Sequence, residues 1–327
     1  MRPVFKSRMF DFVLLCLIWG STWIAIKAGI HSVPPMFFAG SRFTVAGILL
    51  LLIGTVRREP LGLTLAQLPR LLVISLLMIS LCYGPLFWGM QYVNSGTAAV
   101  LELSLTPIAL MCFALLLGEE RWQPSKAGAI ALGVMGLGLL YGPEAMSRAT
   151  GDATAGQRLW GIIAIAAAAF TYGLGSVLAK PLLREHPPFQ IAGATTAIGG
   201  LFLLCYSLLV EDAAWIAVYG RWGVGPWLAW GFLVLFGSLI GYTIFMRLLR
   251  DIGPSKAGSY AFVSPIVAVL LGEVWLGEEV SLLDLAAMTL MMMAAYLALR
   301  AEDSSALPAK DAMEDLPDGR PVRKPRR

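Results

Sequence analysis

Charged residues are scarce in this chain of 327 residues, of which 57% are hydrophobic and only 14% are charged. A soluble domain typically has about 25% charged residues. The mean hydropathy is +0.73, which is high for a chain of this length. The shortage of charge excludes an ordinary soluble domain and predicts an integral membrane protein that crosses the bilayer several times.

Histidine and cysteine are also rare, with two and four residues respectively. The four cysteines lie inside apolar runs, so we interpret them as packing residues and expect neither disulfides nor a metal site. The chain has no Gly-rich nucleotide loop ending in Lys-Ser/Thr and no zinc-protease or hydrolase signature. We therefore expect no ATP drive, no cofactor and no enzymatic activity. The basic residues are scattered between apolar runs, so no nucleic acid partner is expected.

Ten apolar runs each approach the roughly 20 residues that a bilayer core requires. They lie at about 10–29, 36–56, 71–91, 97–117, 125–141, 160–179, 189–210, 227–248, 257–275 and 282–299. A polar segment at 143–159 connects two halves, 1–142 and 160–300, with five runs each. The tail at 301–327 is polar and Pro-rich, so it cannot bury enough apolar surface to fold and is expected to be disordered.

Lys and Arg are distributed unevenly between the connections. With the N-terminus placed in the cytoplasm, most of them flank cytoplasmic ends, and the opposite side receives only Lys27, Arg148, Arg158 and Arg221. The positive-inside rule therefore predicts cytoplasmic N- and C-termini.

Two stretches of the chain repeat one pattern. Trp19–Gly47 and Tyr172–Gly200 share an aromatic-Gly pair, a Lys, a Pro-Pro and an Ala-Gly at a constant offset of 153. Such coincidence of landmarks indicates an internal repeat. Because each half holds an odd number of spans, the second half must enter the membrane inverted relative to the first. Inverted repeats of this kind are typical of transporters that bind substrate near the bilayer midplane.

The motifs and their order carry a family resemblance. The chain reads WG…K…PP…AGSRF, then TP…LLLGEE, and later repeats this grammar through SP…VWLGEE. Over about Phe10 to Leu299, this order resembles the EamA-type members of the drug/metabolite transporter superfamily. The resemblance implies ten helices, with helices 1, 3, 4, 6, 8 and 9 around a central cavity and helices 5 and 10 at the periphery. It also implies a bacterial inner membrane location and relatives that export amino acids or other small metabolites.

Two charged residues lie well inside predicted helices. Glu102 is about one turn inside the fourth helix, and Arg42 lies about as deep in the second. A charge within the bilayer costs roughly 2.5–3.5 kcal/mol on insertion scales, so each needs a partner or a wet cavity. Two interpretations stay open. Glu102 either faces the cavity, where it binds a substrate amine or exchanges a proton, or forms a buried structural pair with Arg42.

Other charged residues lie near helix ends. Glu273, close to the outer end of the ninth helix, either reaches the interface or acts as a coupling or gating acid. Lys27 and Lys180 are repeat equivalents that either extend to the interface or gate opposite mouths of the cavity. Glu119 and Glu120 belong to the first Gly-Glu-Glu signature and are expected at the surface or as helix caps.

Aromatic residues on the helices expected to line the cavity are further candidates. Tyr and Trp combine an apolar ring with a polar group, which suits a partly apolar solute. The substrate-binding candidates are Trp19, Tyr83, Trp88, Glu102, Tyr172, Tyr242 and Tyr260. For each aromatic residue, packing or lipid contact is the alternative. Pro107 and Pro265 occupy equivalent places deep in the fourth and ninth helices and are candidates for gating, because proline kinks a helix.

These features together predict a secondary transporter that exports small metabolites by alternating access. Neutral or zwitterionic solutes such as amino acids are favoured, because few buried cations are available to bind a phosphorylated one. The alternatives are a proton-coupled efflux pump for amphiphilic drugs or cations and, outside transport, a membrane-embedded enzyme or scaffold. The expected partners are a small-molecule substrate and the lipid bilayer. Coupling to protons, and assembly as a monomer or homodimer, stay open.

Overall fold

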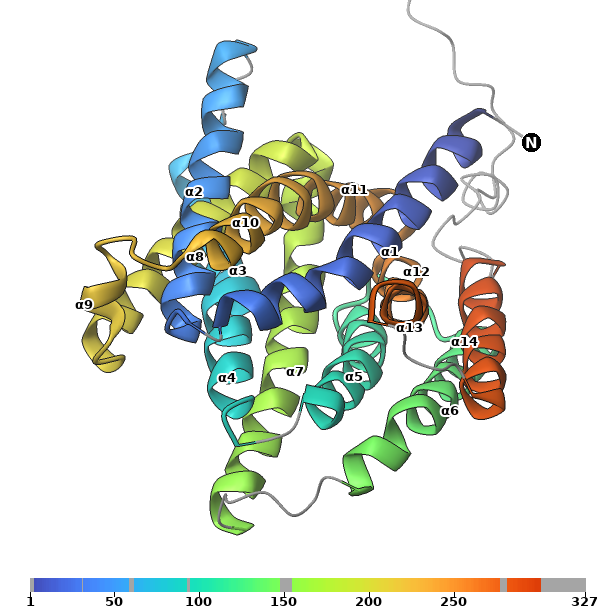
Figure 1. Ribbon diagram of the computed structural model, residues 1–327. Helices are drawn as coiled ribbons and strands as arrows, with labels where there is room; N and C mark the ends of the chain where they lie inside the picture. Colours follow the sequence, from blue (N-terminus) through green and yellow to red (C-terminus); the bar gives the residue numbers. More distant parts are fainter. Residues whose placement is uncertain are drawn as a thin grey trace, which may run out of the picture.

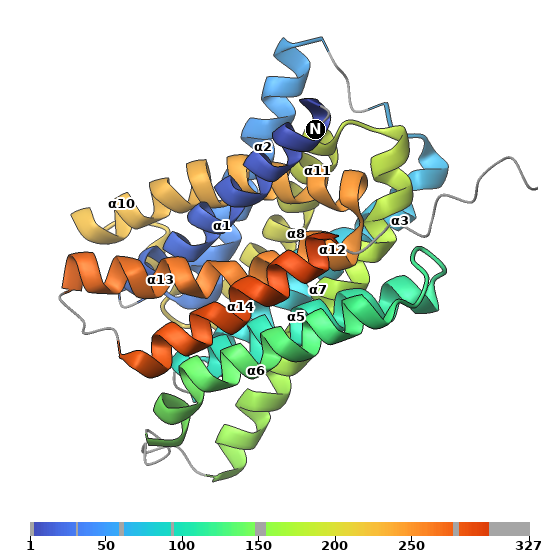
Figure 2. The same cartoon turned by 90° about the vertical axis from the view of Figure 1, so that its right-hand side faces the viewer.

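The computed structural model describes residues 3–30, 32–58, 62–92, 95–147, 155–276 and 281–300. Within these ranges every regular element is a helix, as Figures 1 and 2 show, so the predicted all-α class is confirmed for this part of the chain. The tail at 301–327 and part of the connecting segment, 148–154, lie outside the described residues.

The helices follow the predicted apolar runs closely. The first half contains α1 (Pro3–Ile30), α2 (Pro35–Val56), η1 (Leu65–Gln67), α3 (Leu68–Ser75), η2 (Leu76–Ser80), α4 (Leu81–Gly89), α5 (Ser95–Leu116) and α6 (Pro124–Ser147). The second half contains α7 (Ala155–Glu185), α8 (Pro188–Val210), α9 (Ala214–Ala217), α10 (Val224–Phe232), η3 (Leu233–Tyr242), α11 (Thr243–Ile252), α12 (Pro254–Gly258), α13 (Tyr260–Leu276) and α14 (Leu282–Arg300). The segments η1 to α4 follow one another in a single helical span, Leu65–Gly89, and α10 to α11 do so in Val224–Ile252. Each span contains a π-helical part, η2 in the first and η3 in the second.

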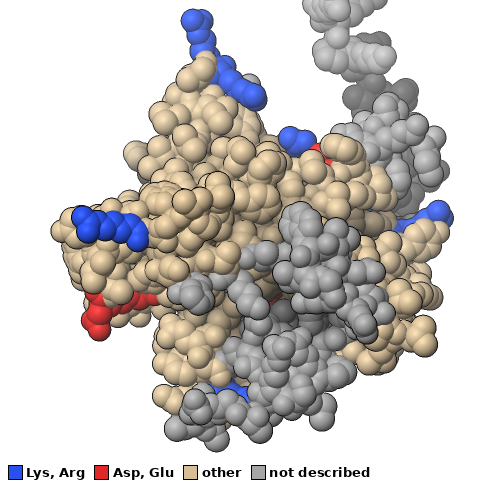
Figure 3. Space-filling model, in the orientation of Figure 1, with Lys and Arg blue, Asp and Glu red and all other residues tan. Residues whose placement is uncertain are grey.

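Six helical segments among the described residues are long and apolar enough to cross a membrane. They are Arg8–Ile30, Pro35–Val56, Leu65–Gly89, Gly156–Glu185, Pro188–Val210 and Val224–Ile252, with shorter apolar helices at Leu101–Leu116, Pro124–Leu139 and Leu285–Arg300. Charged side chains on the described part of the face in Figure 3 are few and lie toward its edges. A largely uncharged surface suits contact with lipid, where charged groups are costly.

The repeated Pro-Pro of the sequence is a repeated helix start. Pro34 and Pro187 have extended backbone angles, with φ −52° and ψ 129° in one and φ −58° and ψ 134° in the other. The proline that follows each of them opens α2 or α8 at a position where no backbone N–H is needed. A residue before proline avoids the helical conformation, so the pair sets the first residue of each helix.

Helices α2 and α8 pack against each other, and glycines set their close approach. A Cβ added at Gly47 would lie 2.2 Å from the backbone nitrogen of Ala197. A Cβ added at Gly200, which is the repeat equivalent of Gly47, would lie 2.5 Å from the nitrogen of Thr44. Each half therefore supplies a glycine that admits the backbone of the other half, which is how helices associate closely in a membrane.

Helices α6 and α14 lie side by side at one edge of the molecule, away from α2 and α8 (Figures 1 and 2). Their contact also depends on a small residue, because a Cβ at Gly136 would lie 2.7 Å from Cγ of Met291. These two helices correspond to the fifth and tenth predicted spans, which the resemblance places at the periphery.

A carboxylate from the second half holds the start of α2. Glu211, just after α8, accepts hydrogen bonds from the backbone N–H groups of Met36 (3.0 Å) and Phe37 (2.9 Å). The hydroxyl of Ser207 also donates to it, at 2.5 Å. The first N–H groups of a helix lack partners within the helix, and an anion there is favourable. Glu211 therefore links the two halves at this point, and no pattern in the sequence indicates it.

We expect Glu211→Ala to lower the free energy of unfolding by about 1–2 kcal/mol, because a helix cap is typically worth that much. The thermal melting temperature of the detergent-purified protein measures the effect. Asp212→Asn is the matched control, since Asp212 is the exposed neighbour in the same turn and its replacement should leave the melting temperature unchanged. Equal melting temperatures for the two variants would show that the cap contributes nothing.

Candidate functional site

A small cavity lies between the two halves of the chain. It is lined by residues of α1, α2, α4 and α5 from the first half and of α7, η3 and α13 from the second. Six of the seven predicted substrate-binding residues line it: Trp19, Tyr83, Glu102, Tyr172, Tyr242 and Tyr260. Its volume of about 70 Å³ leaves room for only a few water molecules. The structure thus brings together side chains that are far apart in the sequence.

Trp88, the seventh candidate, does not line this cavity. Its ring packs against Tyr92 instead, with ring centroids 5.0 Å apart. The reason is helical phase, because five residues at about 100° each place Trp88 roughly 140° around the helix from Tyr83. Leu86 and Phe87 lie on the cavity side of α4.

Aromatic rings close the cavity on the side of α11. The ring of Phe245 is fully buried at 0% exposure. Its centroid lies 5.3 Å from that of Trp19, 5.4 Å from Tyr172, 5.8 Å from Tyr260 and 6.4 Å from Tyr242. These spacings are within the range of favourable aromatic pairs. The four cavity-lining rings are thereby held in place through one buried phenylalanine.

The segment η3 positions part of the wall. It is a π-helix of 10 residues, and such wider turns occur often at functional sites. The indole Nε1 of Trp19 donates a hydrogen bond to the carbonyl oxygen of Gly237 in this segment, at 3.1 Å. The added Cβ of an alanine at Gly241 would lie 2.6 Å from the same indole nitrogen. The η3 segment therefore positions the Trp19 indole in two ways. Gly237 supplies its hydrogen-bond acceptor, and Gly241, which has no side chain, leaves room for the ring.

A proline in α4 explains how α7 is joined to this wall. Pro85 has no backbone N–H, so the carbonyl of Leu81, four residues earlier, lacks its helical partner. The hydroxyl of Thr171 in α7 donates to that carbonyl at 3.2 Å. Side chains of neighbouring helices commonly satisfy such groups within membranes. This hydrogen bond joins α7 to α4 next to the cavity, since Thr171 directly precedes Tyr172 and Leu81 is two residues before Tyr83.

The two prolines predicted for gating lie inside continuous helices. Pro107 is within α5 and Pro265 is within α13, and both side chains are buried. Their role in gating stays a prediction. Glu273, the other gating candidate, lies in α13 outside the residues whose side chains the structure describes.

Arg42 is buried at the cavity with 3% of its surface exposed. The guanidinium carbon lies 4.3 Å from the ring centroid of Phe43 and 5.5 Å from that of Tyr83. Among the described residues its Nε has no hydrogen-bond partner. Cation–π contacts of this kind are worth about 0.5–2 kcal/mol, which offsets only part of the cost of burying a charge.

Glu102 reaches the same cavity from α5. The hydroxyl of Thr106, one turn along, approaches its Oε1 at 3.5 Å, which is at the limit of a hydrogen bond. Among the described residues, no ion pair within 4.0 Å joins Glu102 to Arg42, so these two side chains do not form the direct pair. The aromatic rings hold the Arg42 side chain, so a cation and a carboxylate line one cavity without pairing.

Several residues that line the cavity were not among the substrate-binding candidates predicted from the sequence. Phe43 lies on α2, a helix not expected to line the cavity, although it directly follows Arg42 in the AGSRF motif. Cys82 is a free cysteine in the core at 3% exposure, as its interpretation as a packing residue predicts, and it lines the cavity as well. Ser264, which received no role, also lines the cavity. A buried arginine next to an aromatic residue was the available signal for Phe43. No pattern in the sequence distinguished Cys82 from the other cysteines.

In transporters built from repeats, the substrate site lies at the interface between the repeats, as this cavity does between the two halves of the chain. The model of the EamA-like transporter family matches residues 9–142 and 159–300. The chain therefore belongs to the EamA-like transporter family, and it is an integral membrane protein. The match of two copies is consistent with two repeats.

Named relatives agree with this assignment. The uncharacterized inner membrane transporter YedA of Escherichia coli K12 is 33% identical over 284 residues, which cover 86% of this chain and 87% of YedA. The uncharacterized transporter YoaV of Bacillus subtilis is 28% identical, covering 84% of this chain and 90% of YoaV. A solved structure described as "Crystal structure of protein" has a TM-score of 0.72 at 21% identity, over 89% of this chain and 97% of its own, and supports the fold alone.

Proposed function

We propose that this transporter exports small zwitterionic metabolites, with apolar or aromatic amino acids as its substrates. The observation that carries the proposal is that Arg42 and Glu102 line one aromatic cavity without pairing with each other. Charged groups within a membrane need partners. A zwitterion supplies both at once, with its carboxylate toward Arg42 and its ammonium group toward Glu102.

The walls of the cavity suit the remainder of such a substrate. Tyr83 and Trp19 present ring surfaces for an apolar or aromatic side chain. Among the described residues, the hydroxyl of Ser264 has no hydrogen-bond partner, so it is free to bond a polar group. The cavity must widen to admit an amino acid, because about 70 Å³ holds only a few water molecules. This need for widening supports a mechanism of alternating access.

The proposed architecture is a ten-span inverted repeat with both termini in the cytoplasm. The halves 1–142 and 160–300 would move relative to each other, joined by the segment 143–159. Support comes from the repeated Pro-Pro starts of α2 and α8 and from the matched glycines at their crossing. The proposed location is a bacterial inner membrane, the location given in the name of YedA.

Counterflow in proteoliposomes tests the proposal. A panel of amino acids, nucleobases and cationic dyes is offered with and without an imposed pH gradient. Saturable counterflow of apolar or aromatic amino acids is the expected result. The second candidate, a proton-coupled pump for amphiphilic cations, is favoured by the carboxylate of Glu102 among aromatic rings. Accumulation of dyes driven by the gradient would support that candidate instead, and no saturable flux of any solute would contradict both.

We expect Glu102→Gln to raise KM for a zwitterionic substrate by about 30-fold or more, because truncating a buried charge contact costs about 2 kcal/mol or more. The measurement is counterflow with the amino acid and with the matching acid that lacks the amine. Only the amino acid should lose affinity. Asp212→Asn serves as the control, since that carboxylate is exposed outside the cavity. Equal losses for the two substrates would remove the ammonium-binding role of Glu102.

A further inference from the structure

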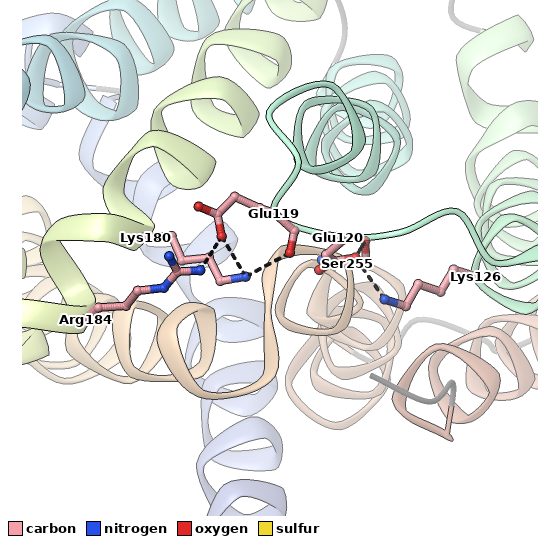
Figure 4. A network of polar contacts seen from close by, with 6 residues as sticks. All are labelled: Glu119, Glu120, Lys126, Lys180, Arg184 and Ser255. Atoms are coloured by element: carbon pink, nitrogen blue, oxygen red, sulfur yellow. Dashed lines mark hydrogen bonds and ion pairs between the residues drawn. The ribbon is translucent and has the colours of Figure 1, made fainter. Parts of the chain in front are cut away.

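A cluster of charged and polar side chains lies where α5 ends, and we call it the Glu119 network. It comprises Glu119, Glu120, Lys126, Lys180, Arg184 and Ser255, shown in Figure 4. Gly118 takes φ +69°, a conformation that glycine adopts easily after a helix. The backbone N–H groups of Glu119 and Glu120 then bond back to the carbonyl of Ala114, at 2.8 and 3.0 Å. The turn explains why glycine precedes the two glutamates of the signature, since Gly118 adopts the positive φ that reverses the chain after α5.

Glu119 joins the first half of the chain to α7 of the second. Its Oε2 lies 2.6 Å from the guanidinium of Arg184 and 3.3 Å from Nζ of Lys180. The same Nζ donates to the backbone carbonyl of Glu119 at 3.4 Å. Lys180 is buried at 8% exposure, and its ammonium group is paired within the protein. The side chain of Lys27, its repeat equivalent, lies outside the described residues.

Glu120 joins the first half to α12. Its carboxylate pairs with Lys126 at 2.9 Å, and it accepts hydrogen bonds from the backbone N–H of Ser255 at 3.1 Å and from its hydroxyl at 2.6 Å. Glu120 therefore caps the start of α12, which the sequence allowed as one of its two roles. The Glu119 and Glu120 side chains are 14% and 7% exposed, so both are partly buried in the turn after α5.

The network and the cavity share their helices. Lys180 lies eight residues beyond Tyr172 on α7, which is about 12 Å along the helix axis. Between these positions an apolar cluster joins α5 to α7, formed by Leu110, Ala114 and Val177, each no more than 1% exposed. On the other side, Ser255 precedes Tyr260 by five residues. An apolar layer thus lies between the cavity and the network along α5 and α7.

We infer that the Glu119 network is the gate that keeps the cavity closed at the end where α5 terminates. This inference rests on the proposed transport function. Its bonds join loop residues of the first half to two elements of the second, α7 and α12, that lead directly to cavity aromatics. Separating the halves at this end requires breaking both connections. The pairs of Glu119 with Lys180 and of Glu120 with Lys126 are largely buried, so these bonds favour the closed state until substrate binding or release changes the cavity.

The native Cys82 reports on the gate because it lines the cavity. In a background with Cys16→Ala, Cys112→Ala and Cys205→Ala, it is the remaining cysteine. A small membrane-impermeant thiol reagent is applied from the side of the network, in vesicles of known orientation. We expect Lys180→Met to raise the labelling rate of Cys82 by about tenfold, within the range of typical coupling between conformational states.

Glu119→Gln should act in the same direction, because it removes the negative charge that pairs with both cations. The control is Arg57→Gln, since Arg57 is exposed at the end of α2, outside the network, and its loss should leave the labelling rate unchanged. The exchange of charges in Glu119→Lys with Lys180→Glu should return the rate toward that of the parent. If the folded variants label at the parent rate, the network is not a gate.

A replacement variant and a protection experiment distinguish failure of the gate from failure of the proposed transport function. Should Lys180→Met fail to fold, Glu119→Gln replaces it, because it keeps the size of the side chain and removes the negative charge that Lys180 and Arg184 share. A rate several times that of the parent supports the gate, and an unchanged rate overturns it. Protection of Cys82 by an amino acid in the parent protein tests the proposed function alone. Protection without any change in the variants overturns the gate and leaves the transport function standing.

Discussion

Gly47→Ala is expected to destabilise the protein by about 3 kcal/mol or more, at the upper end of the cost of overpacking. The added Cβ would lie 2.2 Å from the backbone nitrogen of Ala197 and 2.5 Å from its Cα. Backbone atoms of a helix cannot rotate away as a side chain can. The substitution therefore forces α2 and α8 apart at the crossing that joins the two halves. The yield of monodisperse protein in detergent and its melting temperature measure the loss.

Gly138→Ala is the matched control for this prediction, since no described atom lies within 4 Å of the Cβ position there. Alanine is a better helix former than glycine by about 1 kcal/mol, so this variant should be neutral or slightly stabilised. Adding Ala197→Gly to Gly47→Ala should not restore stability, because the nearest atoms are Ala197 backbone and not its methyl group. A Gly47→Ala protein as stable as the control would refute the close helix crossing.

Arg42→Gln is expected to weaken the binding of zwitterionic substrates by about 2–5 kcal/mol while the protein still folds. The guanidinium lies over the rings of Phe43 and Tyr83, and among the described residues it forms no ion pair with Glu102. Burying a charge without a counterion costs stability. Removing it should therefore leave the melting temperature nearly unchanged, whereas the substrate carboxylate loses its partner.

Counterflow of the amino acid and of the corresponding amine without a carboxylate measures this prediction. Arg42→Gln should raise KM for the amino acid alone. Arg57→Gln is the control, because Arg57 is the exposed arginine that ends the same helix. The opposite pattern, a large drop in melting temperature with equal losses for both solutes, would show that Arg42 holds the helices together and does not bind substrate.

The arrangement of the cavity was predicted in part from the sequence. The aromatic candidates Trp19, Tyr172 and Tyr260 do line it. They could be predicted because the repeat and the family resemblance together indicate which helices surround the cavity. Trp88 does not, because membership of a helix does not set which face a residue occupies. Depth alone left two interpretations of Glu102 open, a cavity-facing carboxylate and a buried pair with Arg42. Equal depth in two helices leaves the lateral distance undetermined, and the rings beside Arg42 decide where its side chain lies.

Long-range contacts were the least predictable feature. Nothing near Pro85 in the sequence indicates that Thr171 bonds the carbonyl of Leu81. Nothing near Glu211 indicates that it caps a helix that begins at Pro35. Both contacts satisfy backbone groups whose partners come from more than 80 residues away along the chain. Local periodicity contains no information about such partners.

The sequence by itself determined that this chain is helical, resides in a membrane and contains a repeat. Those properties depend on composition, on the length of apolar runs and on matching landmarks, which all act locally along the chain. Only the tertiary structure decided that Arg42 and Glu102 share a cavity without pairing, and that Glu119 and Glu120 join the two halves through Lys180 and Ser255. The physical reason is that helix rotation and crossing distance, set by glycines and buried rings, determine which charges meet.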